Sequence, residues 1–173
     1  DRAAEALLLL EARAGTEFDH VAMIQGDEPL VSPDDIERAI DELERDSSLN
    51  IVNLMCSIKG EKSFEDPNDV KVVINMKSDA LYFSREPIPS RWKDKSDTRR
   101  YKQTGLIFFT RDYLLHFNEL DQTPLEKIES VDMMRVLEYG DRVRMVVTEG
   151  KNIGVDTPED FRIAEKLMES DAV

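Results

Sequence analysis

The sequence is poor in cysteine and has no long hydrophobic run. Cys56 is the only cysteine among 173 residues, so no disulfide can form within the chain. We expect a reducing, cytoplasmic setting in which Cys56 is a small buried hydrophobic residue. No apolar stretch approaches the roughly 20 residues that a membrane-spanning helix needs, and residues 6–10 form a run that is far too short. These absences predict a soluble protein with no membrane partner.

Positive charge is also scarce. The chain carries 23 Lys and Arg against 37 Asp and Glu, which gives a formal net charge of -14. Such a surface repels polyanions, so we expect no nonspecific binding to nucleic acid or to an anionic membrane. An anionic ligand of this protein would have to be held by local cations or by a metal ion.

Several familiar catalytic patterns are missing from the sequence. It contains no Walker-type phosphate loop and no Rossmann glycine pattern. His20 and His116 have no serine, cysteine or aspartate at a telling spacing. The sequence therefore supports neither a catalytic triad nor a zinc site.

What is present is an alternation of apolar strand patterns with amphipathic helix patterns. Three helices begin with a cap residue followed by proline, at Ser32, Thr123 and Thr157. We predict helices over 2–13, 33–45, 111–120, 123–140 and 157–170, and strands over 20–24, 50–58, 69–76, 80–84, 104–110 and 143–149.

The length and this order predict one α/β domain over residues 1–173. We expect a three-layer α/β/α arrangement with a mixed, mostly parallel central sheet, and some antiparallel strands near 70–110. The methionines of helix 124–138 are expected to be exposed, which makes this helix a candidate contact surface between subunits.

Two acids directly follow the short strand pattern in "HVAMIQGDEP", residues 20–29. Ligands of open α/β sheets bind beyond the carboxyl ends of strands, so Asp27 is a candidate site residue. Gly26 permits a tight turn before it. The alternative is that Asp27 and Glu28 only form a polar turn before the next helix.

Asp156 stands in a similar place, in "NIGVDTPED" between a strand pattern and a helix pattern. Alone, it is best explained as a helix cap, a role that Thr157 also suits. Asp27 and Asp156 together suggest more, because magnesium in nucleotide enzymes is held by one or two carboxylates and by substrate phosphates. Such a metal would let this acidic protein bind a triphosphate.

Two basic residues fall in or after the strand patterns near 70–85. Arg85 follows a strand, and its planar guanidinium suits two hydrogen bonds to a substrate carboxylate. The alternative is an ion pair with Glu86 or another surface acid. Lys71 lies inside a strand pattern, where we expect its ammonium group to reach the surface.

Five motifs in this order resemble the CMP-Kdo synthetase family, the 3-deoxy-manno-octulosonate cytidylyltransferases. The motifs are "QGDEPL" (25–30), "NDVKVV" (68–73), "ALYFSREPIP" (80–89), "TPLEKIES" (123–130) and "GVDTPED" (154–160). The resemblance implies a Rossmann-like nucleotidyltransferase fold and transfer of CMP from CTP to the anomeric hydroxyl of an acidic 2-keto-3-deoxy sugar, releasing pyrophosphate. It also implies a requirement for magnesium and a homodimer.

The resemblance assigns roles to particular residues. Asp27 and Asp156 would be the catalytic residues that bind magnesium, Gln25 would contact the sugar, and Arg85 would bind the sugar carboxylate. Alternatives are a cytidylyltransferase for another acidic sugar or a phosphonate, and a noncatalytic binding protein that kept the fold.

The chain departs from the family at positions that contact the sugar. Where the family usually has a histidine and, four residues on, a tyrosine, this chain has Gln103 and Ile107. Where the family usually has Glu-Gln after "PLE", this chain has Asp132 and Met133. With Gln103 and Asp132 as the sugar-binding residues here, we expect altered acceptor discrimination, and the acceptor could be a different 3-deoxy or nonulosonic acid.

The nucleotide half of the site is expected mostly outside these residues. The family's N-terminal strand and its glycine-rich, basic loop for the CTP phosphates would lie before Asp1. The opening "DRAAEAL" resembles a stretch near the family's cytosine site, so Arg2 is predicted to border the base.

Overall fold

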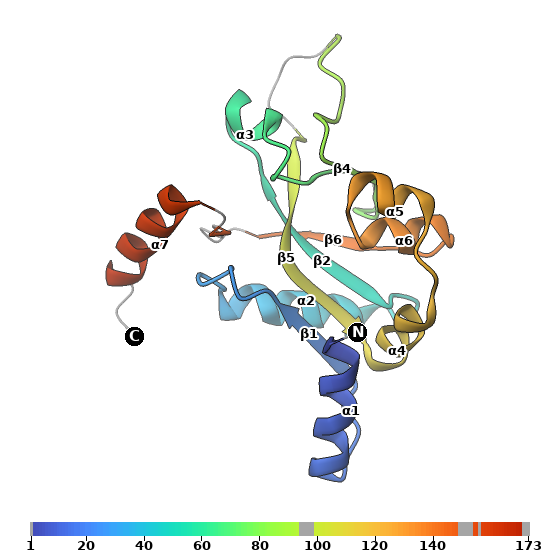
Figure 1. The fold of residues 1–173 in the computed structure, drawn as a ribbon. Helices are drawn as coiled ribbons and strands as arrows, with labels where there is room; N and C mark the ends of the chain where they lie inside the picture. The colour runs from blue at the N-terminus through green and yellow to red at the C-terminus, as the bar shows by residue number, and fades with distance from the viewer. Residues whose placement is uncertain (1, 94–98, 149–153, 156, 171–173) are drawn as a thin grey trace.

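The computed structural model describes residues 2–93, 99–148, 154–155 and 157–170 (Figure 1). The helices are α1 (Arg2–Ala14), α2 (Pro33–Arg45), α3 (Glu61–Glu65), α4 (Arg111–Glu119), α5 (Pro124–Glu129), α6 (Met133–Glu138) and α7 (Pro158–Ser170). The strands are β1 (His20–Ile24), β2 (Ile51–Ser57), β3 (Lys71–Ile74), β4 (Ala80–Ser84), β5 (Tyr101–Thr110) and β6 (Arg144–Val147). No helix among these residues is long and apolar enough to cross a bilayer.

The strands form one mixed sheet in the order β4-β3-β5-β2-β6, and β1 pairs with β5. The long strand β5 runs antiparallel to β1, β2 and β3, and β3 runs antiparallel to β4. Only β2 and β6 pair in parallel within the described residues. The predicted α/β class with a mixed sheet is confirmed, but the expected parallel majority is not found there, because the central strand opposes three of its neighbours.

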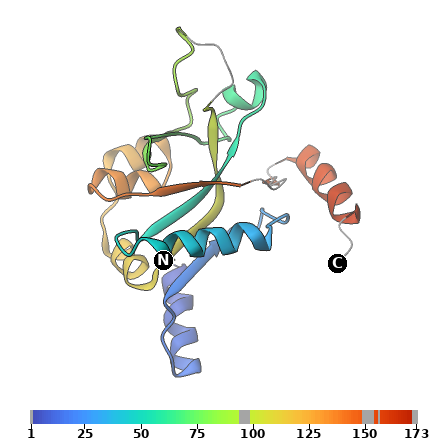
Figure 2. The same cartoon turned by 180° about the vertical axis from the view of Figure 1, so that it is seen from behind.

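Helices cover both faces of the sheet, as the two opposite views show (Figures 1 and 2). On one face, Leu106 and Phe108 of β5 pack with Ala39 and Leu43 of α2. On the other face, alternate β5 residues such as Phe109 pack with side chains from α1, α4 and α6. The period-2 alternation of a strand thus supplies both cores, and the predicted three-layer arrangement is confirmed.

The predicted helix 123–140 is two helices. Ser130 adopts a left-handed conformation with φ 53°, which ends α5 because an α-helix cannot continue through it. Met133 and Met134 of α6 are each 1% exposed. The expectation of exposed methionines on this segment is therefore wrong.

The predicted helix caps differ in outcome. At α7, Thr157 Oγ1 accepts from the Asp160 N–H at 3.2 Å, and Asp160 Oδ2 accepts from the Thr157 N–H at 2.9 Å, as predicted. At α2, Ser32 makes no side-chain cap bond, and the buried Asp35 instead accepts a hydrogen bond from Thr148 Oγ1.

Candidate functional site

A pocket of about 530 Å³ lies where the end of β1 meets β5. Its walls come from the turn after β1, the middle of β5, the segment from α3 to β3, the exit from β4, the α5–α6 junction and the start of α7. The ionisable residues that line it are Asp27, Glu28, Cys56, Lys62, Asp66, Asp69, Arg85, Lys102, Asp132 and Asp160. Acids outnumber bases among them, so an anionic substrate in this pocket needs a cation, as the net charge suggested.

An irregularity in β5 shapes the pocket floor. The pairing of β2 with β5 shifts register after the pair Asn53–Ile107. The buried Asn53 Nδ2 donates to the carbonyls of Thr104 at 3.1 Å and Leu106 at 3.0 Å. Such irregularities redirect side chains and are frequent beside functional sites.

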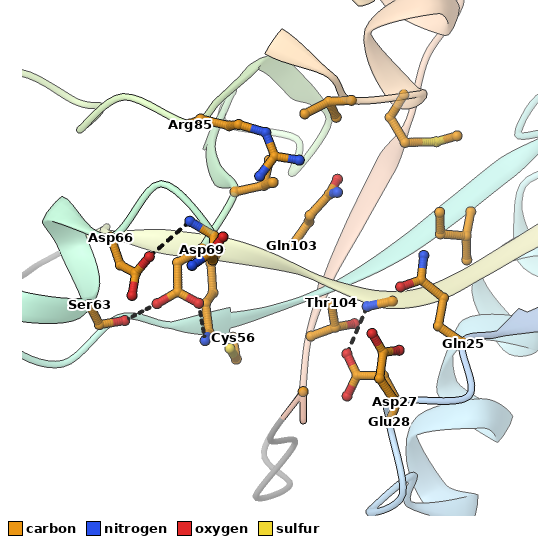
Figure 3. A pocket seen from close by; sticks show the side chains of 18 of the residues that line it. Gln25, Asp27, Glu28, Cys56, Ser63, Asp66, Asp69, Arg85, Gln103 and Thr104 are labelled. Atoms are coloured by element: carbon orange, nitrogen blue, oxygen red, sulfur yellow. Dashed lines mark hydrogen bonds and ion pairs between the residues drawn. The ribbon is translucent and has the colours of Figure 1, made fainter. Parts of the chain in front are cut away.

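The turn after β1 is fastened to Gly105 of β5. The Gln25 N–H donates to the Gly105 carbonyl at 3.2 Å, and the Gly105 N–H donates to Glu28 Oε1 at 2.8 Å (Figure 3). A Cβ at position 105 would lie 2.7 Å from Gln25 Oε1, a distance that real Cβ atoms do not show. A side chain at position 105 would therefore displace the Gln25 side chain from its place over β5. Glu28 has the structural role that the polar-turn alternative gave it.

Asp27 lies between Gln25 and Glu28 in the turn after β1, and its side chain is exposed at the pocket. Its carboxylate makes no hydrogen bond or ion pair with any residue that the structure describes. Its backbone carbonyl accepts from the Val155 N–H at 2.9 Å, which ties the last part of the chain to this turn. Asp156 itself lies outside the described residues.

Arg85 lines the pocket at the exit from β4, where it is held by backbone carbonyls. Its Nε donates to Glu129 O at 2.9 Å, one terminal nitrogen to Pro67 O at 2.9 Å and the other to Ser130 O at 3.1 Å. The alternative of an ion pair with Glu86 is not seen. Three of the five N–H donors of a guanidinium are engaged in this way, which fixes its orientation and leaves two.

Glu129 joins β4 to α5 and was not predicted from the sequence. Its carboxylate accepts from the Arg85 N–H at 3.0 Å, from Tyr82 Oη at 3.0 Å and from Ser84 Oγ at 3.1 Å. Burial, together with the bond to Glu129, raises the pKa of Tyr82, so its hydroxyl stays protonated and donates.

Lys71 does not reach the surface as expected. It is fully buried, and its Nζ donates to Asp66 O at 2.8 Å and to Arg85 O at 2.5 Å. The carbonyl oxygens replace water around the ammonium group, although burial still lowers the pKa of Lys71. We call Lys71, Arg85 and Glu129 the Arg85 cluster.

Gln103 and Asp132 both line the pocket. Gln103 Oε1 is buried and has no hydrogen-bond partner among the described residues, although buried polar atoms nearly always have one. Asp132 is exposed and makes no side-chain bond to cap α6. Ile107 and Met133 also line the pocket, so this wall is apolar around an amide and a carboxylate.

Arg2 is not brought to this pocket. It lies exposed in the first turn of α1, a helix that packs on the sheet through Ala4 and Leu7. The pocket thus collects Gln25, Asp27, Arg85, Gln103 and Asp132 of the predicted residues, while the assignment of Arg2 to the base remains a prediction.

A second polar group in the pocket was missed by sequence reasoning. Ser63 Oγ donates to Asp69 Oδ2, and Lys102 Nζ donates to Asp69 Oδ1 at 2.6 Å. Burial is the largest single influence and acts to lower the pKa of Lys102, but the hydrogen bond to Asp69 and the nearby negative charges of Asp69 and Glu28 act together to raise it. We call these residues the Asp69 cluster. No spacing in the sequence links Lys102 to Ser63 and Asp69, because the pairing of β3 with β5 brings Lys102 to them.

The residues present fit a magnesium site of the kind that nucleotide enzymes use. The described residues contain no group of three or more His, Cys, Asp or Glu side chains that would hold a metal by themselves. The unpaired carboxylate of Asp27 is an oxygen ligand open to the pocket, and magnesium commonly takes one or two carboxylates and completes its shell with substrate phosphates and water.

The chain is similar to known proteins over most of its length. The family described as Cytidylyltransferase matches residues 1–152. The 3-deoxy-manno-octulosonate cytidylyltransferase of Geobacter metallireducens is 44% identical over 170 residues, which cover 92% of this chain and 67% of that protein. The enzyme of the same name from Geotalea uraniireducens is 42% identical over 171 residues, covering 93% and 67%. The chain therefore spans about two thirds of the length of these relatives.

Solved structures give the same picture. A structure of CMP:2-keto-3-deoxy-manno-octonic acid synthetase complexed with CTP superposes with a TM-score of 0.84 at 30% identity, covering 98% of this chain and 69% of the other. A putative glucose-1-phosphate thymidylyltransferase from Bacillus anthracis gives a TM-score of 0.61 at 20% identity, covering 100% of this chain and 64% of the other. The second likeness concerns the fold alone.

Proposed function

The chain belongs to the cytidylyltransferase family, and we propose that it transfers CMP from CTP to 3-deoxy-manno-octulosonate or a close relative of that sugar acid, releasing pyrophosphate. The single observation that carries the proposal is the pocket itself. It combines an unpaired carboxylate at Asp27, an oriented guanidinium at Arg85 and a buried amide oxygen without a partner at Gln103. A sugar acid offers its carboxylate to the Arg85 guanidinium and its hydroxyl donors to Gln103 Oε1.

The reaction needs no covalent enzyme intermediate. The anomeric hydroxyl oxygen attacks the α-phosphorus of CTP, and the bond from that phosphorus to the oxygen bridging to the β-phosphate breaks. Pyrophosphate leaves with the electron pair, and the hydroxyl proton passes to water. Holding the two reactants in line accounts for most of what a protein must do in such a transfer.

We assign the acceptor to Arg85, Gln25 and Gln103, with Asp132 beside them. The two free N–H donors of Arg85 suit the acceptor carboxylate, because the three bonds to backbone carbonyls hold the guanidinium in place. Gln25 is pressed over Gly105 and presents its amide to the pocket. The apolar Ile107 and Met133 in this wall are the reason to keep a related sugar acid as a second acceptor.

We assign magnesium to Asp27 and Asp156. The Val155 N–H bond to the Asp27 carbonyl supports this pairing, as does the capping of α7 by Thr157 and Asp160, which leaves no need for Asp156 as a cap. A bound magnesium ion would neutralise charge on the phosphates and polarise the α-phosphate. The residues of the chain orient the acceptor toward the α-phosphate.

The decisive assay is pyrophosphate release from CTP and magnesium by the complete protein, with a panel of 2-keto-3-deoxy sugar acids. We expect release with 3-deoxy-manno-octulosonate or a relative, and at least about a hundredfold lower kcat in Asp27→Asn and Asp156→Asn, since charge stabilisation by the metal amounts to several kcal/mol. Asp41→Asn, an exposed acid of α2, is the matched control. Release with none of the acids, or undiminished release from Asp27→Asn, would contradict the proposal.

We also propose that the complete protein is a homodimer, as the family resemblance implies. Ile128 of α5 is 75% exposed. Because the methionines are buried, Ile128 is the candidate apolar contact residue of the segment 124–138. Sedimentation equilibrium of the complete protein and of Ile128→Lys tests this: a monomer in the unmodified protein rejects the dimer, and an unaffected dimer in the variant rejects this surface.

A further inference from the structure

The Asp69 cluster occupies its own part of the pocket. Figure 3 shows Arg85, Asp69 and Asp27 at three separate places around the cavity. Lys102 and Ser63 hold the two carboxylate oxygens of Asp69, and all three side chains line the cavity. The donors of Arg85 go elsewhere, to the carbonyls of Pro67, Glu129 and Ser130. A ligand anchored at Arg85 therefore meets the Asp69 cluster with a different part of itself.

Stability does not account for this cluster. Lys71 and Lys102 lie directly opposite each other on β3 and β5, so their side chains share one face of the sheet. Like charges in that relation destabilise a sheet. The Asp69–Lys102 pair is partly open to the pocket, with the side chains 21% and 28% exposed, so solvent in the pocket screens part of the attraction between the two charges. An uncharged residue at position 102 would avoid the repulsion altogether.

The cluster offers a balanced set of hydrogen-bonding groups. The Lys102 ammonium has three N–H donors, of which Asp69 takes one, and the Asp69 carboxylate retains free lone pairs. The charges of Asp69 and Lys102 cancel, so the cluster suits a neutral partner that both donates and accepts. Adjacent hydroxyl groups on a carbon chain have this character.

We propose that Ser63, Asp69 and Lys102 bind the hydroxylated tail of the acceptor sugar acid, and thereby select acceptors whose tail is long enough to reach them. This inference rests on the proposed function, in which Arg85 holds the acceptor carboxylate. The Asp69 cluster then recognises the far end of the same molecule. The two anchor points set the length of the acceptor.

The test compares two acceptors with the complete protein, CTP and magnesium. One acceptor is 3-deoxy-manno-octulosonate, and the other is a shortened 2-keto-3-deoxy acid that ends before the tail hydroxyls. We expect the unmodified protein to prefer the longer acceptor in kcat/KM by about 10- to 100-fold, because a site built for hydroxyls rejects analogues that lack them.

In Lys102→Met and Asp69→Asn this preference should fall to within about threefold of unity. The loss should come through KM for the longer acceptor and should exceed any change in kcat/KM for the shortened acceptor. Lys102→Arg should restore most of the preference, and Lys77→Met, an exposed lysine in the β3–β4 turn, should leave it intact.

The outcomes separate the two proposals. If the unmodified protein reacts with both acceptors and the variants keep its preference, or lose activity equally with both, the tail site is wrong and the proposed function stands. If it reacts with neither of these acceptors nor with any other acid of the panel, the proposed function fails and the tail site with it. Should Lys102→Met lose its urea unfolding transition, Asp69→Asn, which preserves shape, provides the same comparison.

Discussion

The Arg85 cluster and the Asp69 cluster lie in the same pocket but are built in different ways. In the first, the cations Lys71 and Arg85 bind backbone carbonyls, five in all, and Glu129 fixes the chain that carries them. In the second, Lys102 binds one side-chain carboxylate. Backbone carbonyls move only when the fold moves, whereas a carboxylate turns with its own side chain. The first cluster is therefore set by the fold, and the second can adjust to a ligand.

The largest effect should follow from breaking the Arg85 cluster at Glu129. Glu129→Ala removes the acceptor for the Arg85 N–H and for the Tyr82 and Ser84 hydroxyls. Because unpaired buried donors are costly, we expect the free energy of unfolding to fall by about 3 kcal/mol, and the acceptor KM to rise. Urea unfolding measures the first. Glu119→Ala, an exposed acid of α4, is the control, and an equal loss in both variants would contradict the role of Glu129.

The next effect should come from Lys71. Lys71→Met leaves the carbonyls of Asp66 and Arg85 without their donor in a fully buried place. We expect the free energy of unfolding to fall by about 2 kcal/mol, with the acceptor KM raised because Arg85 loses a backbone anchor. Thermal and urea unfolding check this. If Lys71→Met were as stable as the unmodified protein, the free-energy cost of burying the Lys71 charge would equal the stabilisation from its two hydrogen bonds. This prediction would then be wrong.

A smaller effect on stability is expected at Lys102, directly opposite Lys71. Lys102→Met breaks only a partly exposed ion pair, so the free energy of unfolding should change by less than about 1 kcal/mol. The same two unfolding experiments give the contrast. If Lys102→Met proved as destabilising as Lys71→Met, the two clusters would not differ in the way described.

The smallest effect is a difference in the pH dependence of the two lysines. The pKa of Lys71 is lowered in the fold, so the unfolded chain binds more protons between that lowered pKa and about 10.4, and stability rises with pH in this window. The pKa of Lys102 is raised, so its contribution is complete below about 10.4 and is lost as the pH rises through the folded pKa. Unfolding of each Met variant against the unmodified protein from pH 8 to 11 should show slopes of opposite sign, and slopes of the same sign would contradict one of the two assignments.

The parts of the fold that local patterns determine were predictable. The helix start at Thr157 follows from a cap residue, a proline and an acid within one turn, and the structure has both cap bonds. The break at Ser130 was not predictable, because Ser130 is neither glycine nor proline, and a left-handed conformation is uncommon for such a residue. The antiparallel course of β5 likewise depends on pairing across the sheet.

The residues of the candidate site likewise divide into those that local patterns predict and those that depend on the tertiary fold. Asp27 and Arg85 follow strand patterns directly, so the sequence pointed to them, and Gln103 and Asp132 were found through the family resemblance. Ser63, Asp69 and Glu129 lie on a short helix, a loop and the end of a helix, with nothing local to distinguish them from surface residues. The burial of Lys71 depends on carbonyls supplied by two other segments, which no local pattern reveals.

The bond from the Val155 N–H to the Asp27 carbonyl also limits when this part of the nascent chain can fold. It joins the turn after β1 to a residue that is made much later, 128 positions further along the chain (155 minus 27). At synthesis rates of about 5–20 residues per second, roughly 6 to 26 seconds separate the two on the ribosome. Through that interval β1 and its turn exist without this partner, so the nascent chain cannot close this side of the pocket until Val155 has been made.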